Sequence, residues 1–187
     1  YYGGRVYIGT EYLAFGASGT NHELHVLCVS DTTVLGCSPT TPVWMGSVNV
    51  NHNVNSIAVS GSYAFLATSD DVGELTVINI SNPATMVIDP NMKYNAVTTS
   101  SGASGEDGTA VYLLGNTVYL GRDRVSGSTK SDFYILNAAS TTNITVTGKL
   151  KLGIGSGSQT SGIVTQGRYS FVATTDSNRP FFVIDVI

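Results

Sequence analysis

An internal repeat of about fifty residues constrains this chain more than any other feature of its sequence. Residues 57–81 match residues 6–30 without a gap after a shift of 51 positions. The same segment matches residues 163–187 after a shift of 106. A period of this length suits propeller blades of four strands and not the coils of a β-helix, and it means that one supersecondary unit is copied along the chain.

A third copy lies between these, in two matching halves, residues 115–121 and residues 132–137, with an inserted loop between them. The chain of 187 residues therefore holds four copies of one unit. We expect a single domain, residues 1–187, with copies at about 4–51, 52–107, 108–160 and 161–187.

The ungapped alignment places Tyr12 opposite Tyr63 and Tyr169, and places residues 1–5 opposite residues 52–56. It predicts that the chain opens directly with the first strand of a unit. The last copy stops after its third strand, so its outer strand is missing.

Each copy is predicted to form about four antiparallel strands. In the second copy, apolar runs at residues 56–60, 63–68 and 74–80 are separated by Gly, Asp and Asn, which favour turns. The second run is apolar on both faces, as expected for a strand covered on both sides. Sheets packed face to face about an axis form a propeller. We predict an all-β propeller of four blades of about four antiparallel strands, with almost no helix and an incomplete last blade.

The missing outer strand has three explanations that the sequence leaves open. The last blade has only three strands, or the chain continues with further blades, or another subunit adds the strand. An open strand edge is a template for pairing. We therefore single out the edge at residues 181–187, with Phe181 and Phe182 as interaction candidates.

Two motifs in the second and fourth copies point to a known repeat. Residues 74–83 read ELTVINISNP, residues 59–68 read VSGSYAFLAT, and residues 182–186 read FVIDV. These strings resemble LVIVD-repeat β-propellers, and the resemblance covers all four copies. It implies a bacterial or archaeal cell-surface or secreted propeller, sometimes attached to a pilin-like or anchored N-terminus, and implies no catalytic residues. Cys28 replaces the usual Asp, and the Asn-Pro signal occurs only at Asn82-Pro83.

Charge makes nucleic acid and anionic membranes poor partners. Only 12% of the residues are charged, and the net charge is −4. No apolar run approaches the roughly 18 residues of a membrane span, so no membrane insertion is expected within this segment. The first residues look like the start of a processed or excised segment, so any leader or anchor would lie outside it.

Cys28 and Cys37 bear on the compartment. If Thr32 and Thr33 form a two-residue turn, the cysteines fall at a non-hydrogen-bonded pair of a hairpin, where Cβ atoms approach most closely. This register favours a cross-strand disulfide, with two buried free thiols as the alternative. A disulfide indicates an oxidising compartment, so we expect an extracellular or cell-surface location.

Three acidic residues, Asp70, Asp71 and Glu74, are weak candidates for a Ca²⁺ site, because they bring oxygen ligands together in one loop. The full calcium-loop signature is absent, and the simpler reading is a solvated acidic turn. We expect no resident cofactor and no metal.

The sequence holds no catalytic motif, so we expect no enzyme and no catalytic residue. A hydrolase reading would need carboxylates that converge on the propeller axis, and Asp70, Asp123 and Asp176 occupy comparable loops.

Remaining candidates concern contacts and modification. Arg122 and Arg124 open the inserted loop of the third copy, and Trp44 is either a contact anchor or a packed outer-strand residue. Asn79 and Asn143 begin acceptor triplets for N-glycosylation, and Asn143 is expected in a loop.

We therefore predict a non-enzymatic extracellular surface module, structural or adhesive, which could form the globular part of a pilus-like filament subunit. The expected partner is protein, either a further copy of the chain or another surface protein. The alternative is a propeller that binds a glycan or peptide at the mouth of the ring, and a hydrolase is the least favoured reading.

Overall fold

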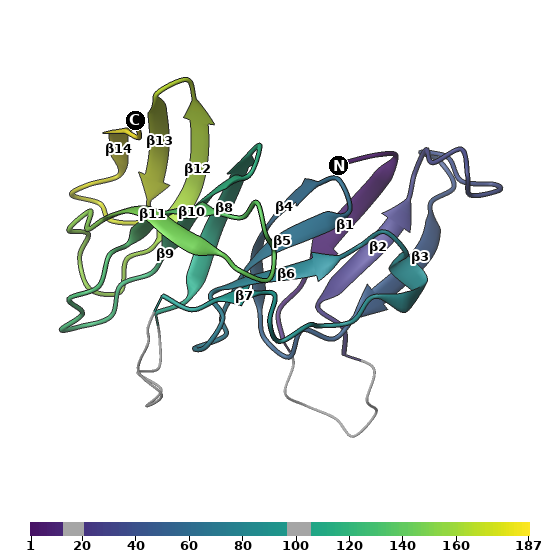
Figure 1. Cartoon of the computed structure of the whole chain (residues 1–187), viewed down its shortest axis with the longest axis horizontal. Coiled ribbons are helices and arrows are strands. Elements are labelled where there is room, and N and C mark those ends of the chain that lie inside the picture. The colour runs from purple at the N-terminus through teal and green to yellow at the C-terminus, as the bar shows by residue number, and fades with distance from the viewer. Residues whose placement is uncertain (13–20, 97–105) are drawn as a thin grey trace.

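The computed structural model describes residues 1–12, 21–96 and 106–187, and the regular secondary structure of this part of the chain consists almost entirely of antiparallel strands. The strands form four separate sheets, which we call blades 1 to 4 in chain order (Figure 1). Blade 1 holds β1 (Arg5–Gly9), β2 (Leu24–Cys28) and β3 (Val43–Val48). Blade 2 holds β4 (Val54–Ser60), β5 (Tyr63–Thr68), β6 (Leu75–Asn79) and β7 (Lys93–Tyr94). Blade 3 holds β8 (Gly108–Leu114), β9 (Thr117–Arg122), β10 (Phe133–Asn137) and β11 (Thr145–Leu150). Blade 4 holds β12 (Thr160–Gln166), β13 (Tyr169–Thr174) and β14 (Phe181–Asp185).

This arrangement confirms the predicted all-β architecture of four antiparallel blades with a three-stranded last blade. The described residues contain one short 3-10 helix, η1 (Pro83–Thr85). The Asn82 side chain caps it by accepting a hydrogen bond from the Ala84 backbone N–H at 3.2 Å. Within the described ranges, no helix is long and apolar enough to cross a membrane.

A glycine with positive φ lies just before one strand of every blade, namely β1, β5, β9 and β13. Gly3, Gly61, Gly115 and Gly167 have φ values of 56°, 56°, 59° and 60°. Residues with a Cβ rarely adopt this conformation, so the recurrence of glycine reflects a repeated turn. The next residue in each blade accepts a hydrogen bond through its carbonyl, from Val29, Ile80, Ala138 and Val186 respectively.

These turns show that the predicted alignment of the first copy is wrong. Arg5 pairs with Cys28 and Gly9 with Leu24, just as Tyr63 pairs with Asn79 at the corresponding position in blade 2. Strand β1 therefore corresponds to β5 at a shift of 58 residues. The shift of 51 holds only for β2 against β6, because seven extra residues lie between β1 and β2 and the links that follow β2 and β6 differ in length.

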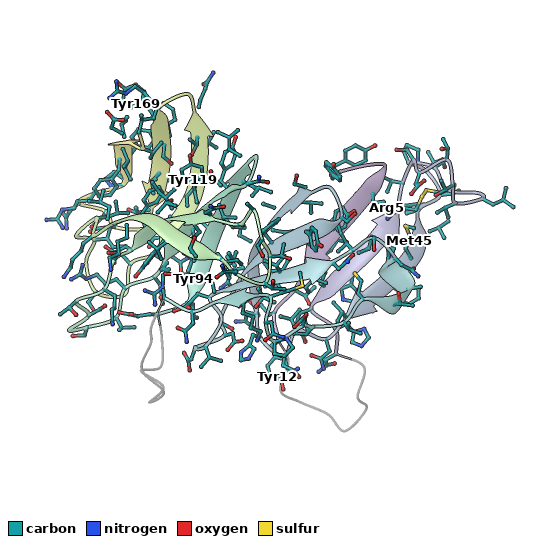
Figure 2. The ribbon with its side chains drawn as sticks, viewed as in Figure 1. Arg5, Tyr12, Met45, Tyr94, Tyr119 and Tyr169 are labelled. Carbon is teal, nitrogen blue, oxygen red and sulfur yellow. A yellow bond between two sulfur atoms is a disulfide. The ribbon has the colours of Figure 1, made fainter. Side chains whose placement is uncertain are left out.

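The corrected register changes the place of Tyr12. It follows β1 and does not begin a strand, and its backbone N–H donates to the Asn53 side chain at 2.7 Å. Figure 2 shows Tyr12 below the sheets and Tyr169 near the tip of blade 4. In the described residues, blade 1 has no counterpart of the first strands β4, β8 and β12.

Three hydrophobic clusters lie between successive blades and form the core. The cluster between blades 2 and 3 includes Phe65 and Val77 from one side and Leu120 and Leu136 from the other. Corresponding clusters join blade 1 to blade 2 and blade 3 to blade 4. A strand between two such clusters is buried on both faces, as β5 is, which explains why its sequence lacks polar alternation.

The four blades form an open arc and not a closed ring. The first strands β4, β8 and β12 lie side by side. Blades 1 and 4 lie at opposite ends of the long axis (Figure 1). Each of these blades therefore has one face that no neighbouring blade in the described chain covers.

Candidate interaction surface

The outward face of blade 4 carries a cluster of exposed apolar side chains. Val164, Phe171 and Val183 are directly paired across the three strands and therefore share a face. Phe181 lies beside them, and its ring stacks on that of Phe171 with 6.3 Å between centroids. Phe181 and Val183 are each 57% exposed. We call these four residues the end face.

The repeat shows which buried positions of blade 2 correspond to the end face. Phe171 and Val183 occupy the positions of Phe65 and Val77 in blade 2, which pair in the same way. Phe65 is 5% exposed and Val77 is completely buried, because blade 3 covers them. The end face is thus one half of a blade-to-blade interface, and no other blade of the described chain covers it.

Blade 1 exposes the opposite half. Val6, Leu27 and Trp44 are paired across β1, β2 and β3, so they form one row on the face turned away from blade 2. Ile8 lies two residues beyond Val6 on the same face. Trp44 lies on the outer strand β3 and is 64% exposed, so the alternative of a packed outer-strand residue is wrong. We call Val6, Ile8, Leu27 and Trp44 the start face.

Arg122 is not available as a surface contact, contrary to the sequence prediction. Its side chain is completely buried between blades 2 and 3. One terminal nitrogen lies 3.0 Å from Glu74 Oε1 and 3.1 Å from Glu106 Oε2. The guanidinium carbon sits 5.8 Å from the centroid of the Tyr134 ring. Arg122 therefore joins two blades from the inside.

Arg124 lies nearer the surface than Arg122. It donates to the Ser128 carbonyl oxygen at 3.3 Å and lies 3.8 Å from the carboxylate of the buried Asp132. The first contact holds the inserted loop against itself, and the second ties it to the start of β10. Phe182, the other residue of the predicted edge pair, points inward and packs against the core between blades 3 and 4.

Two of the three carboxylates considered for Ca²⁺ face cations of the protein instead. Asp70 lies 2.5 Å from Lys93 Nζ and 3.6 Å from His52 Nε2. Burial acts to raise the pKa of Asp70, but Lys93, the Val72 backbone N–H and His52 together outweigh it and hold the pKa below its usual value. Glu74 pairs with Arg122, and Asp71 is exposed in the turn between β5 and β6.

Glu74 belongs to a repeated structural device that the sequence did not reveal. It accepts a hydrogen bond from the Ala96 backbone N–H, in the link towards blade 3. Glu23 and Asp132, at the corresponding positions, accept from the backbones of Val50 and Leu152. Each carboxylate thus fixes the chain that leads to the next blade. Burial raises the pKa of Glu74, although Arg122 acts against this shift.

Among the residues that the structure describes, no group of three potential metal ligands comes together.

A polar pocket of about 400 Å³ lies where β4, β8 and β12 begin. Equivalent positions of three blades line it, together with one residue that follows β9: Asn53, Asn55, Asp107, Thr109, Asp123, Gln159 and Ser161. Burial, with the neighbouring Asp107 carboxyl, raises the pKa of Asp123 to about 6. Burial also raises the pKa of Asp107. The pocket offers amides, hydroxyls and two carboxyl groups whose pKa values lie above the usual value of an aspartate.

Only one of the three carboxylates expected to converge for hydrolysis lies in this pocket. Asp123 lines it, whereas Asp70 pairs with Lys93. The Asp176 carboxylate accepts hydrogen bonds from the backbone N–H groups of Gly155 and Asn178. The partner of Asp123 is Asp107, whose own backbone N–H donates to the Asp123 carboxylate at 2.5 Å.

A disulfide joins Cys28 and Cys37, as predicted. The expected cross-strand hairpin is wrong, because Cys28 pairs with Val43 of β3 and Cys37 lies in the loop between the strands. The Asp31 side chain accepts a hydrogen bond from the Thr33 backbone N–H at 2.9 Å, so the chain turns at residues 31–33. The bond therefore fastens a long loop to the end of β2.

The two candidate glycosylation residues differ in setting. Asn79 ends β6, and its side-chain oxygen accepts hydrogen bonds from the backbone and hydroxyl of Ser81. Asn143 is exposed in the loop before β11, the kind of site that the sequence predicted for it.

Comparison with known protein families identifies the repeat type of one of the four blades. No curated protein sequence matches the chain. Residues 52–93, which run from just before β4 to the start of β7, match the family model of the LVIVD repeat. The resemblance noted from the sequence motifs is thereby confirmed at blade 2, and the chain carries an LVIVD repeat within a stack of four blades.

Proposed function

We propose that this chain is a non-enzymatic extracellular surface module, structural or adhesive, that works by holding protein partners. The observation that carries the proposal is the end face. Its four apolar side chains occupy positions that are covered by protein between blades 2 and 3. Contiguous apolar surface of this kind marks a site of protein contact.

Two further features support a place outside the cell. The Cys28–Cys37 disulfide needs an oxidising compartment to persist. The low content of charged residues, 12%, leaves a surface rich in hydroxyl and amide groups. A filament subunit is one form that such a module takes, because head-to-tail contacts that do not close produce filaments.

The polar pocket favours a second candidate, the binding of a neutral glycan. Its lining of amides, hydroxyls and carboxyl groups can donate to and accept from sugar hydroxyls. Hydrolysis of a glycan at this site would have to use Asp107 and Asp123 as its acid and base.

Adhesion of coated microspheres separates these candidates. Beads carrying the chain would be applied to three surfaces, coated with gelatin, with dextran, or with the chain itself. The proposal predicts retention on at least one protein surface, and loss of that retention in a Val183→Lys variant. Retention on dextran alone, unchanged by Val183→Lys and abolished by Asp123→Ala, would contradict it and favour the glycan reading.

A further inference from the structure

The two uncovered faces of the arc match one another as the two halves of an internal interface. Between blades 2 and 3, Phe65, Ala67, Leu75 and Val77 pack against Val118, Leu120, Tyr134 and Leu136. The strand pairing puts Phe171, Ala173, Phe181 and Val183 of blade 4 at the first set of positions. It puts Val6, Ile8, His25 and Leu27 of blade 1 at the second set.

The same contact already occurs three times in the chain. Tyr7 and Val26 of blade 1 meet Leu66 and Ile78 of blade 2. Tyr119 and Phe133 of blade 3 meet Val172 of blade 4. Every blade thus turns one kind of face toward the next blade in the chain and the other kind toward the preceding blade. Between successive blades the two kinds of face cover each other. The end face and the start face are the members of this series that have no partner in the described residues.

We infer that a second copy of this chain occupies the end face through its start face, in a head-to-tail contact. The inference rests on the proposed function and names the partner. The contact continues the blade-to-blade series from one molecule to the next, with β13 and β14 of one copy facing β1 and β2 of the other. It is heterologous, because the two surfaces in contact are different. Two copies close a ring, or further copies extend it as a filament.

The side chains at the two faces suit such a contact. Phe181 and Trp44 are both large, aromatic and more than half exposed, and aromatic anchors of this kind dominate interface energetics. The residues placed at the two faces include no Asp, Glu, Lys or Arg. Charged groups near them in the sequence are paired, Arg168 with Asp185 in blade 4 and Arg5 with Asp31 in blade 1. A contact between the two faces therefore buries no acidic, lysine or arginine side chain at its centre.

Blocked variants test the direction of the contact. In Val183→Lys the end face is blocked, and in Ile8→Lys the start face is blocked. Val146→Lys is the matched control, because Val146 is 43% exposed on β11, away from both faces. A lysine buried at an interface without a partner is expected to weaken association roughly 100-fold. Circular dichroism would confirm that all three variants fold.

Light scattering coupled to size-exclusion chromatography gives the readout, against a chain mass of 19.6 kDa. The wild type and Val146→Lys should associate, and each blocked variant alone should be monomeric. An equimolar mixture of Val183→Lys and Ile8→Lys should form a dimer, because it restores one wild-type pair of faces.

Two results would overturn the inference. One is a wild type that stays monomeric up to about 100 µM, well above the Kd expected for a standard interface. The other is dimerisation of Ile8→Lys alone, which would mean that two end faces pair with each other. Bead retention on gelatin together with a monomeric wild type would leave the proposed function standing without this partner.

Discussion

Replacing Arg122 with methionine should destabilise this protein more than any comparable surface change. The Arg122 side chain is completely buried, and its cation offsets the carboxylates of Glu74 and Glu106. Methionine fills much of the same volume but carries no charge. The substitution therefore leaves two acidic groups at the interface between blades 2 and 3 without their cation.

The magnitude follows from the burial of the two partners. Glu74 is 1% exposed and Glu106 is 7% exposed. Breaking a buried pair by removing one partner destabilises a protein by about 3–5 kcal/mol. Glu74 keeps its hydrogen bond from the Ala96 N–H at 2.8 Å, so we expect the lower half of this range. With a urea m-value of about 2 kcal/mol/M, the unfolding midpoint should fall by roughly 1.5–2 M.

Urea unfolding followed by far-ultraviolet circular dichroism measures this change, because the signal reports all four sheets. Arg168→Met is the matched control. Arg168 also pairs with a carboxylate, that of Asp185, but both groups are exposed. Its substitution should leave the midpoint where it is. Adding Glu74→Gln to Arg122→Met should recover part of the loss, because one uncompensated charge disappears.

An Arg122→Met midpoint within 0.3 M of the wild type, on the order of 0.6 kcal/mol, would refute this reasoning. It would mean that the buried ion pairs contribute little beyond the apolar packing around them. A double variant less stable than Arg122→Met alone would refute it as well. It would mean that the uncompensated carboxylate of Glu74 is not a source of the lost stability.

Three further perturbations have expected outcomes of their own. The pKa of Asp123 is raised to about 6 in the folded state. Ionisation of this carboxyl therefore lowers the free energy of unfolding as the pH rises through 6, and this loss is absent below about pH 4. Asp123→Asn should therefore stabilise the protein at pH 7 by on the order of 1–2 kcal/mol and flatten thermal unfolding midpoints between pH 4 and 7. Replacing Cys28 and Cys37 together by alanine should destabilise by about 2–3 kcal/mol in urea, the value for a closed loop of about ten residues; an unchanged midpoint would contradict this role. Gly108→Ala should destabilise by about 1–3 kcal/mol or prevent folding, because its Cβ would lie 2.1 Å from the Glu74 carbonyl oxygen, whereas Gly162→Ala, with nothing within 4 Å, should be neutral in the same assay.

The sequence predicted the blades but not where the first one begins. Copies two to four align by their Gly-x-Tyr-x-Phe type turns and apolar strands, and the structure has the strands there. In the first copy, the match of Glu23 and Leu24 is real, but it fixes only β2. Strand β1 is displaced by seven residues, and the true signal was the turn at Gly3, which resembles the turn at Gly61.

The surface residues were harder to predict than the strands. Val183 looks like a core residue, because Val77, at the equivalent position in blade 2, is completely buried. Only the place of Val183 in the last copy distinguishes it. Arg122 presented the opposite problem, since a basic residue beside an inserted loop suggests exposure. Its burial depends on Glu74 and Glu106, which approach it only when blades 2 and 3 pack together.

Amide hydrogen exchange tests the stacked arc most directly, because protection reports which strands lie between two blades. We predict slow exchange for β5, β6, β9 and β10, each flanked by a blade on both sides, and faster exchange for β14 in dilute solution. Raising the protein concentration should slow the exchange of β14 and leave that of β11 unchanged. Equal protection of β6 and β14 at every concentration would contradict the account, because it would mean that the two strands are covered alike.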